Sequence, residues 1–89
     1  MRVVRTFTLK NALGLHARVA VMMVNTAKQF SADIYFERNG IVVNGRSILG
    51  ILTLACPKGG TITITAEGED AAGAMEAFEK LIESRFGED

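Results

Sequence analysis

The sequence predicts an α+β fold, a two-layer open-faced β-sandwich in which three helices cover one face of a four-stranded antiparallel sheet. Three observations support this fold class. Residues 61–68, TITITAEG, alternate apolar and polar side chains, as a half-buried strand does. Asn39-Gly40 separates two strand-like runs and is a strong hairpin signal. Other segments repeat apolar residues with a helical period, so the expected order is β-α-β-β-α-β-α, with the helices covering the apolar face of the sheet.

Two further segments complete the expected sheet. Residues 3–10, VVRTFTLK, are rich in β-branched and aromatic residues, which favour a strand, and one side of it would carry Val3, Phe7 and Leu9. In residues 32–44, the run before the hairpin turn alternates Ile34 and Phe36 with polar neighbours, so this strand is expected to bury one face.

Three helices are expected between and after these strands. The first spans about residues 17–30, where apolar side chains recur at helical spacings. The second is short, about residues 47–54, with Ser47 at or near its N-cap. The third is long: Asp70 is expected to cap it, and its apolar side chains recur every 3.6 residues as far as Phe86.

The composition limits what the protein can be. Its 89 residues fit one domain, residues 1–89, with a modest core and no deep, enclosed active site. There is no apolar run of 18 residues, so no membrane insertion is expected, and the first residues resemble a strand and not a signal peptide, so we expect a cytoplasmic protein. One cysteine and one histidine exclude an internal disulfide and a zinc site, and we expect no metal or cofactor. The cysteine, Cys56, is expected to be a small core side chain.

Charge is distributed unevenly along the chain. The net charge is zero, which speaks against a general nucleic-acid binder. Residues 1–66 carry eight basic and two acidic side chains, a balance of +6, whereas residues 67–89 carry two basic and eight acidic ones, a balance of −6. The first part would therefore favour an anionic group or an acidic partner. The acidic part is also explained by a last helix with a solvated face.

The single histidine, His16, stands where the first helix should begin, two residues before Arg18. Helix N-termini present unpaired N–H groups and bind anions, and a histidine there tends to stay neutral and nucleophilic near pH 7. A dianion on its ring would meet these N–H groups and the guanidinium of Arg18, as a reversible phosphohistidine requires. A hydrolase would need an orienting carboxylate, and none stands near His16 in the sequence. Taken alone, the spacing also fits an ordinary exposed histidine at a helix start.

Three stretches together resemble one family. They are LGLHAR at residues 13–18, VNGRSILGILTLA at residues 43–55 and ITITAEGEDAAGAMEAFEKLI at residues 62–82. In this combination and at these separations they resemble HPr, the histidine-containing phosphocarrier of the bacterial phosphotransferase system. The resemblance covers nearly the whole chain, from Phe7 to Phe86, and agrees with the order of elements above.

The resemblance implies a role for each matching residue. His16 would accept a phosphoryl group on Nδ1 from enzyme I and pass it to enzyme IIA proteins, with Arg18 supporting the phosphate. Ser47 would be the serine that an ATP-dependent HPr kinase phosphorylates in many bacteria. The protein would then be a carrier and not an enzyme, and we expect a monomer. The expected docking surface for these partners consists of apolar residues around the two helix starts: Ala17, Ala20, Ile48, Leu49 and Leu52. Ile48, Leu49, Ile51 and Leu52 could also all be core residues, but a short helix cannot bury all four, so we expect at least one or two of them to be exposed.

One departure from the family pattern leaves alternatives open. The family usually has proline after the arginine, and here the residue is Val19, which leaves a less rigid helix start and one more N–H donor. This leaves room for a regulatory branch, such as the nitrogen-related phosphotransferase chain. A second alternative is an interaction module controlled by Ser47, with His16 idle. A third, a small RNA- or ligand-binding domain, agrees with the fold alone, but zero net charge and a single polar aromatic residue, Tyr35, speak against it.

Overall fold

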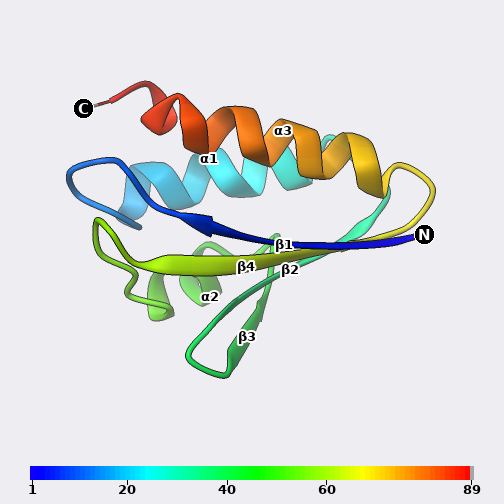
Figure 1. Cartoon of the computed structure of the whole chain (residues 1–89). Helices are drawn as coiled ribbons and strands as arrows, with labels where there is room; N and C mark the ends of the chain where they lie inside the picture. The colour runs from blue at the N-terminus through cyan, green and yellow to red at the C-terminus, as the bar shows by residue number, and fades with distance from the viewer. Residues whose placement is uncertain (89) are drawn as a thin grey trace.

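Four antiparallel strands form one sheet in the order β1-β4-β2-β3, with helices α1 and α3 side by side above it (Figure 1). The structure is a computed structural model that describes residues 1–88. The elements run in the predicted order, followed by a short 3-10 turn η1: β1 (Arg2–Thr8), α1 (Ala17–Ala27), β2 (Asp33–Arg38), β3 (Ile41–Asn44), α2 (Ile48–Thr53), β4 (Thr61–Glu67), α3 (Ala71–Glu83) and η1 (Arg85–Gly87). The predicted fold class is therefore confirmed.

The two faces of the sheet differ as the alternation predicts. Side chains on the helix-facing side of β2 and β4 are buried, because they pack beneath the helices: Ile34, Phe36, Ile62, Ile64 and Ala66. Phe36 meets Phe78 of α3 edge to face, with ring centroids 5.4 Å apart. The opposite face is open and rich in threonine, and there the hydroxyls of Thr6 and Thr63 are hydrogen-bonded at 2.8 Å.

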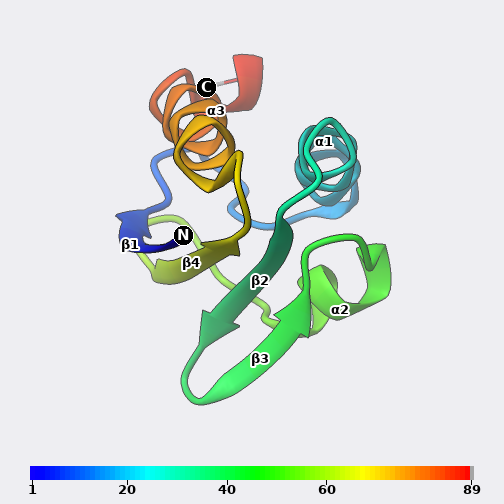
Figure 2. The same ribbon diagram turned by 90° about the vertical axis from the view of Figure 1, so that its right-hand side faces the viewer.

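The helices cover the sheet from one edge to the other. Figure 2 shows α3 above β1 and β4, α1 above β2, and α2 beside β3 at the far edge. The hairpin that joins β2 and β3 turns at Asn39 and Gly40, whose φ angles are +53° and +81°. Such a two-residue turn matches the twist of the strands, so the Asn-Gly signal is confirmed. Among residues 1–88, no helix is long and apolar enough to cross a bilayer.

The first helix ends earlier than its apolar period predicts. α1 stops at Ala27, three residues before the predicted end at Phe30. The N–H groups of Gln29 and Phe30 bond to carbonyls three residues back, at 3.1 and 3.2 Å, which tightens the last turn. Nη2 of the Arg46 guanidinium donates to the carbonyl oxygens of Ala27 and Phe30, and so supplies a donor to acceptors at and just beyond the end of the helix.

The predicted cap of α3 is wrong in its mechanism. Asp70 occupies the N-cap position, yet its side chain makes no hydrogen bond to the helix. Both carboxylate oxygens instead accept the backbone N–H groups of Ser31 and Ala32, each at 2.8 Å. Asp70 therefore pins the loop between α1 and β2, a contact across 38 or 39 residues of sequence.

The last helix is also shorter than predicted. α3 ends at Glu83, and Phe86, which continues its apolar period, lies in η1. Arg85, Phe86 and Gly87 have φ angles of +55°, +55° and +72°, so the chain turns in the left-handed region over three successive residues. Phe86 is nonetheless buried, because this turn folds its ring back into the core.

Candidate functional site

His16 occupies the N-cap position of α1, with an extended backbone at φ −103° and ψ 176°. The first helical hydrogen bond runs from the Ala20 N–H to the His16 carbonyl oxygen at 3.0 Å. The three preceding N–H groups, of Ala17, Arg18 and Val19, therefore have no acceptor within the helix. His16 thus stands beside a set of free backbone donors, as the sequence predicts.

The loop before His16 is packed against the segment that follows α2. The Leu15 N–H donates to the Cys56 carbonyl oxygen at 2.9 Å. Gly14 has φ +61°, and a Cβ built on it would lie 2.3 Å from that same carbonyl oxygen. Only glycine fits this backbone at this separation. The loop therefore fixes where His16 stands relative to α2.

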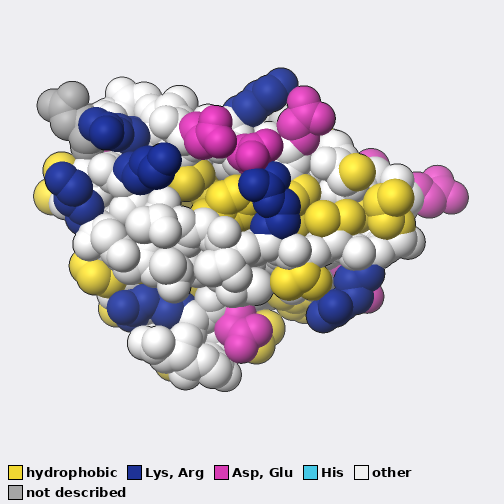
Figure 3. Space-filling model, viewed as in Figure 1, with side chains coloured by type: hydrophobic (Ala, Val, Ile, Leu, Met, Phe, Trp, Pro, Cys, Tyr) yellow, Lys and Arg dark blue, Asp and Glu magenta, His cyan; other side chains and the backbone are white. Residues whose placement is uncertain are grey.

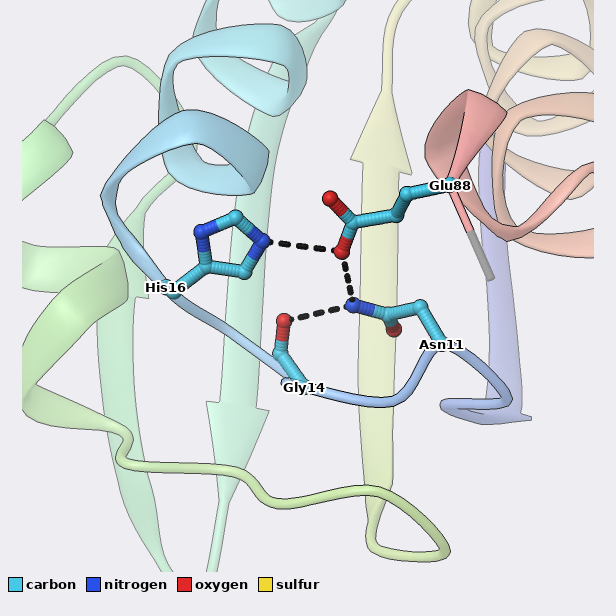
Figure 4. Close-up of polar contacts among 4 residues, drawn as sticks. All are labelled: Asn11, Gly14, His16 and Glu88. Atoms are coloured by element: carbon cyan, nitrogen blue, oxygen red, sulfur yellow. Dashed lines mark hydrogen bonds and ion pairs between the residues drawn. The ribbon is translucent and has the colours of Figure 1, made fainter.

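A carboxylate that the sequence did not reveal contacts the ring. Glu88 lies 72 residues further along the chain, and its Oε1 is 2.8 Å from Nε2 of His16 (Figure 4). The same oxygen accepts Nδ2 of Asn11 at 2.9 Å, and this amide also donates to the Gly14 carbonyl oxygen at 2.8 Å. Asn11 is completely buried. The side chains of His16 and Glu88 are only 27% and 18% exposed.

The two donors on Glu88 determine its charge. Hydrogen bonds from His16 and then from Asn11 lower the pKa of the Glu88 carboxyl below its usual range, with smaller contributions from the charges of His16 and Arg18, while partial burial opposes them. Glu88 is therefore ionised near neutral pH and can only accept hydrogen bonds. Because both partners of a hydrogen bond cannot be acceptors, Nε2 of His16 carries a proton, and in the neutral ring the lone pair is on Nδ1.

The remaining ring nitrogen faces the helix start. In Figure 4, Nδ1 lies on the side of the His16 ring turned toward the first turn of α1, away from Glu88. Arg18, in that first turn, is exposed. Figure 3 shows the face viewed in Figure 1, on which the His16 ring is not visible; basic side chains gather at its left end, where Figure 1 places the loop leading into α1, and acidic side chains gather over α3. The site thus offers a nucleophilic nitrogen beside free N–H groups and positive charge.

The residues predicted to form a docking surface differ in their exposure. Leu49 and Ile48 are 77% and 39% exposed, and Ala17 is exposed, whereas Leu52 is half-buried. Ala20 is completely buried, so its assignment to a docking surface is wrong. It follows His16 by one helical turn on the face that packs on the sheet, and a partner cannot touch it.

Ser47 caps α2 as predicted. Its Oγ accepts the Gly50 N–H at 2.9 Å, and its own carbonyl oxygen accepts the Ile51 N–H at 3.0 Å. Ser47 itself is half-buried, and Ile51 is buried, so the helix is anchored on one side only. The capping serine therefore lies next to the exposed side chains of Ile48 and Leu49.

Among residues 1–88, the structure supports neither a reactive thiol nor a metal site. Cys56 is buried, and burial raises the pKa of its thiol, as expected of a core cysteine. Within residues 1–88, no group of three histidine, cysteine or acidic side chains could hold a metal ion. Sequence reasoning missed Glu88 and Asn11. The only available signal for Glu88 was the acidic balance of residues 67–89, and it does not single out one carboxylate.

Comparisons with known proteins point to one family. A family model described as the phosphorylation site of the PTS HPr component matches residues 3–84. The chain is 44% identical over 78 residues to the phosphocarrier protein HPr of Neisseria meningitidis, which covers 88% of each chain. It is 40% identical over 84 residues to that of Cupriavidus necator, covering 94% of each. Its structure is similar to that of HPr from Thermoanaerobacter tengcongensis, with a TM-score of 0.93 at 42% identity over 98% of each chain. Crh, a catabolite repression protein of Bacillus subtilis seen as a domain-swapped dimer, gives a TM-score of 0.74 at 33% identity, covering 88% of this chain and 90% of Crh.

Proposed function

Because the chain belongs to the HPr family of phosphocarrier proteins, we propose that His16 is the residue that carries the phosphoryl group. The phosphoryl donor would be enzyme I charged by phosphoenolpyruvate, and the acceptors would be enzyme IIA proteins. The observation that carries this proposal is that the two ring nitrogens have different surroundings. Nε2 contacts Glu88 at 2.8 Å, whereas Nδ1 lies beside the start of α1.

The transfer is a displacement at phosphorus. The Nδ1 lone pair of His16 forms the new N–P bond while the bond to the donor breaks and its electron pair returns to the donor. The incoming dianion would be bound by the N–H groups at the start of α1 and by the Arg18 guanidinium. This chain supplies no general base, since Nδ1 needs no deprotonation. It therefore acts as a substrate of enzyme I and not as a catalyst.

Partner docking is proposed on the exposed apolar residues beside this site. Leu49 and Ile48 stand out from α2, and the segment after α2 packs against the loop before His16 through the Leu15–Cys56 hydrogen bond. Apolar area next to an anion site suits proteins that must deliver and receive the same phosphoryl group. A Leu49→Ser variant should transfer phosphate more slowly in both directions, while Ile41→Ser, an exposed apolar residue at the start of β3, serves as its control.

The test of His16 uses the unmodified protein. Incubation with enzyme I and phosphoenolpyruvate should add the mass of one phosphoryl group in an acid-labile form. His16→Ala should abolish this adduct, and Ser47→Ala should retain it. An acid-labile adduct that survives in His16→Ala would show that another residue carries the phosphoryl group.

A second, regulatory function is proposed for Ser47. Crh, to which the chain is similar, is named for catabolite repression, and Ser47 lies beside the exposed Ile48 and Leu49. Phosphorylation by an ATP-dependent HPr kinase would add about −1.5 to −2 charge to that surface and would repel acidic partners. Treatment with the kinase and ATP should give an acid-stable adduct in His16→Ala but not in Ser47→Ala. The absence of the adduct in both variants would exclude this function.

The monomeric state remains a prediction. A related HPr of Thermoanaerobacter tengcongensis is known as a dimer, with a TM-score of 0.78 to this chain at 44% identity. Sedimentation at micromolar concentration, with the protein both phosphorylated and unphosphorylated, distinguishes a monomer from a dimer.

A further inference from the structure

We propose that Glu88 is a positioning residue for phosphoryl transfer: it holds the proton of His16 on Nε2 and balances the positive charge that the ring acquires when Nδ1 is phosphorylated. This inference rests on the proposed function of His16 and adds to it a second group, brought from the segment after α3. Three features of the structure support it: the contact itself, the buried amide that holds the carboxylate, and the backbone that delivers it.

The contact allows only one of the two neutral tautomers of the His16 ring. An ionised carboxylate cannot donate, so the 2.8 Å contact requires an N–H on Nε2. A tautomer with the proton on Nδ1 would place two acceptors against each other and would also block the attacking lone pair. Glu88 therefore disfavours the unreactive tautomer of His16.

Asn11 keeps the carboxylate in place. Its amide nitrogen contacts two oxygens, Oε1 of Glu88 at 2.9 Å and the Gly14 carbonyl at 2.8 Å. Both are acceptors, which fixes which end of the amide is nitrogen. The other end, Oδ1, is buried without a hydrogen-bond partner within residues 1–88. A buried polar atom without a partner lowers the stability of the fold, so we infer that the two hydrogen bonds of the amide nitrogen are the reason this amide is buried here.

The backbone just before Glu88 is strained, and this strained turn directs the chain toward the site. Arg85 and Phe86 have φ +55°, a conformation that costs residues with a Cβ about 1–2 kcal/mol each. Strain of this kind persists where the surrounding structure requires it, and it is common at functional sites. Here the turn brings the chain back from the end of α3, so that Glu88 reaches the loop before α1 (Figure 4).

The charge balance explains why a carboxylate suits this position. Before transfer, the neutral ring carries one N–H, on Nε2. When Nδ1 forms the N–P bond, the ring nitrogens bear both a proton and a phosphoryl group, so the ring itself becomes cationic. Glu88 is in place before this charge develops, and an interaction that strengthens during the reaction lowers its barrier.

The test separates charge from hydrogen bonding. Glu88→Gln retains an oxygen that can accept both N–H groups but removes the charge, whereas Glu88→Ala removes both. Glu76→Gln, which removes one exposed charge from α3 far along the chain from His16 in sequence, is the matched control. For each protein we would record the ring nitrogen spectrum of ¹⁵N-labelled His16 above pH 8 and the rate of phosphorylation by enzyme I.

The expected results form a pattern that a purely structural role would not produce. Wild type and Glu76→Gln should show only the Nε2–H tautomer, and Glu88→Ala should show a mixture of both. Glu88→Gln should keep the wild-type tautomer but lose about tenfold in phosphorylation rate, the equivalent of one weakened charge interaction. If the Glu88→Ala ring spectrum equals that of wild type, or if Glu88→Gln is phosphorylated at the wild-type rate, the proposal is overturned.

These outcomes are distinguishable from a failure of the proposed function. The spectrum of the unphosphorylated ring needs no partner protein. If wild type shows only the Nε2–H tautomer and Glu88→Ala shows a mixture, but wild type receives no phosphoryl group on His16, then the function proposed for His16 is wrong while the effect of Glu88 on the ring is retained.

Discussion

Replacing Gly14 by alanine tests whether the loop that carries His16 depends on close packing against the segment after α2. Gly14 has φ +61°, and an added Cβ would lie 2.3 Å from the Cys56 carbonyl oxygen and 2.8 Å from Cα of Pro57. Both contacts are with backbone atoms, which cannot rotate away as a side chain could. The loop and the segment after α2 must therefore separate, and the hydrogen bond from the Leu15 N–H to Cys56 is expected to break.

The cost can be built up from these parts. A left-handed backbone costs an alanine about 1–2 kcal/mol, and a lost hydrogen bond costs about 1 kcal/mol more. The sum, about 2–3 kcal/mol, should lower the melting temperature by roughly 10–20 °C in a domain of this size. Phosphorylation of His16 should slow as well, because the displaced loop carries both the ring and the carbonyl that Asn11 binds.

Gly59→Ala provides the control. Gly59 has φ +84°, also in the left-handed region, and a Cβ there would meet nothing within 4 Å. Its substitution should therefore cost the backbone contribution alone, about 1–2 kcal/mol, and leave phosphorylation unchanged. Thermal unfolding followed by circular dichroism compares the two variants. If Gly14→Ala melts at the same temperature as Gly59→Ala, the close approach at Gly14 does not constrain the loop.

Three other predictions concern the helix starts and the acidic side chains. Val19→Ala removes two fully buried methyl groups and should lower the free energy of unfolding by about 2 kcal/mol. Val19→Pro should lower it by less, because the Val19 N–H has no acceptor within α1. Urea unfolding that finds the proline variant less stable than the alanine variant would contradict this. Ser47→Ala removes the acceptor of the Gly50 N–H and should cost about 1 kcal/mol, which Ser47→Asp should restore; equal melting of wild type and Ser47→Ala would refute the cap. The pKa of Glu79 is lowered by its hydrogen bond and ion pair with Arg5, and that of Glu88 by His16 and Asn11, so both contribute stability that is present above the usual 4.5 and lost as the pH falls through their folded pKa. Circular dichroism during an acid titration should therefore show a loss of stability below pH 4.5, and this loss should be smaller in Glu79→Gln. A loss of stability that is already complete above pH 4.5 would contradict the prediction.

The parts of the fold that depend on local pattern were predictable from the sequence. Alternation in β4 placed Ile62 and Ile64 in the core, and the two turn residues placed the hairpin, because strand period and turn geometry are set within a few residues. His16 at a helix start was predictable for the same reason. Its chemistry, however, became specific only through the resemblance of three separate stretches to one family.

Contacts between distant segments were not predictable. Asp70 has the sequence context of a helix cap, but the loop after α1 offers it two N–H groups at 2.8 Å, and only the assembled fold brings that loop near. The family resemblance placed Ala20 on the docking surface, but the sheet beneath α1 buries it. In both cases a tertiary contact decides what the side chain does.

The segment that delivers Glu88 shows most clearly why the site could not be read from sequence alone. Phe86 continues the apolar period of α3, so the pattern predicts helix, yet Arg85 and Phe86 turn left-handed at a cost of about 2–4 kcal/mol together. Burying the Phe86 ring returns about 1.5–3 kcal/mol, which leaves the turn close to balance. The contacts of Glu88 with Asn11 and His16 then decide whether the turn persists. The conformation of this segment and the choice of tautomer at His16 are therefore coupled through Glu88, and a substitution at Asn11 should alter both.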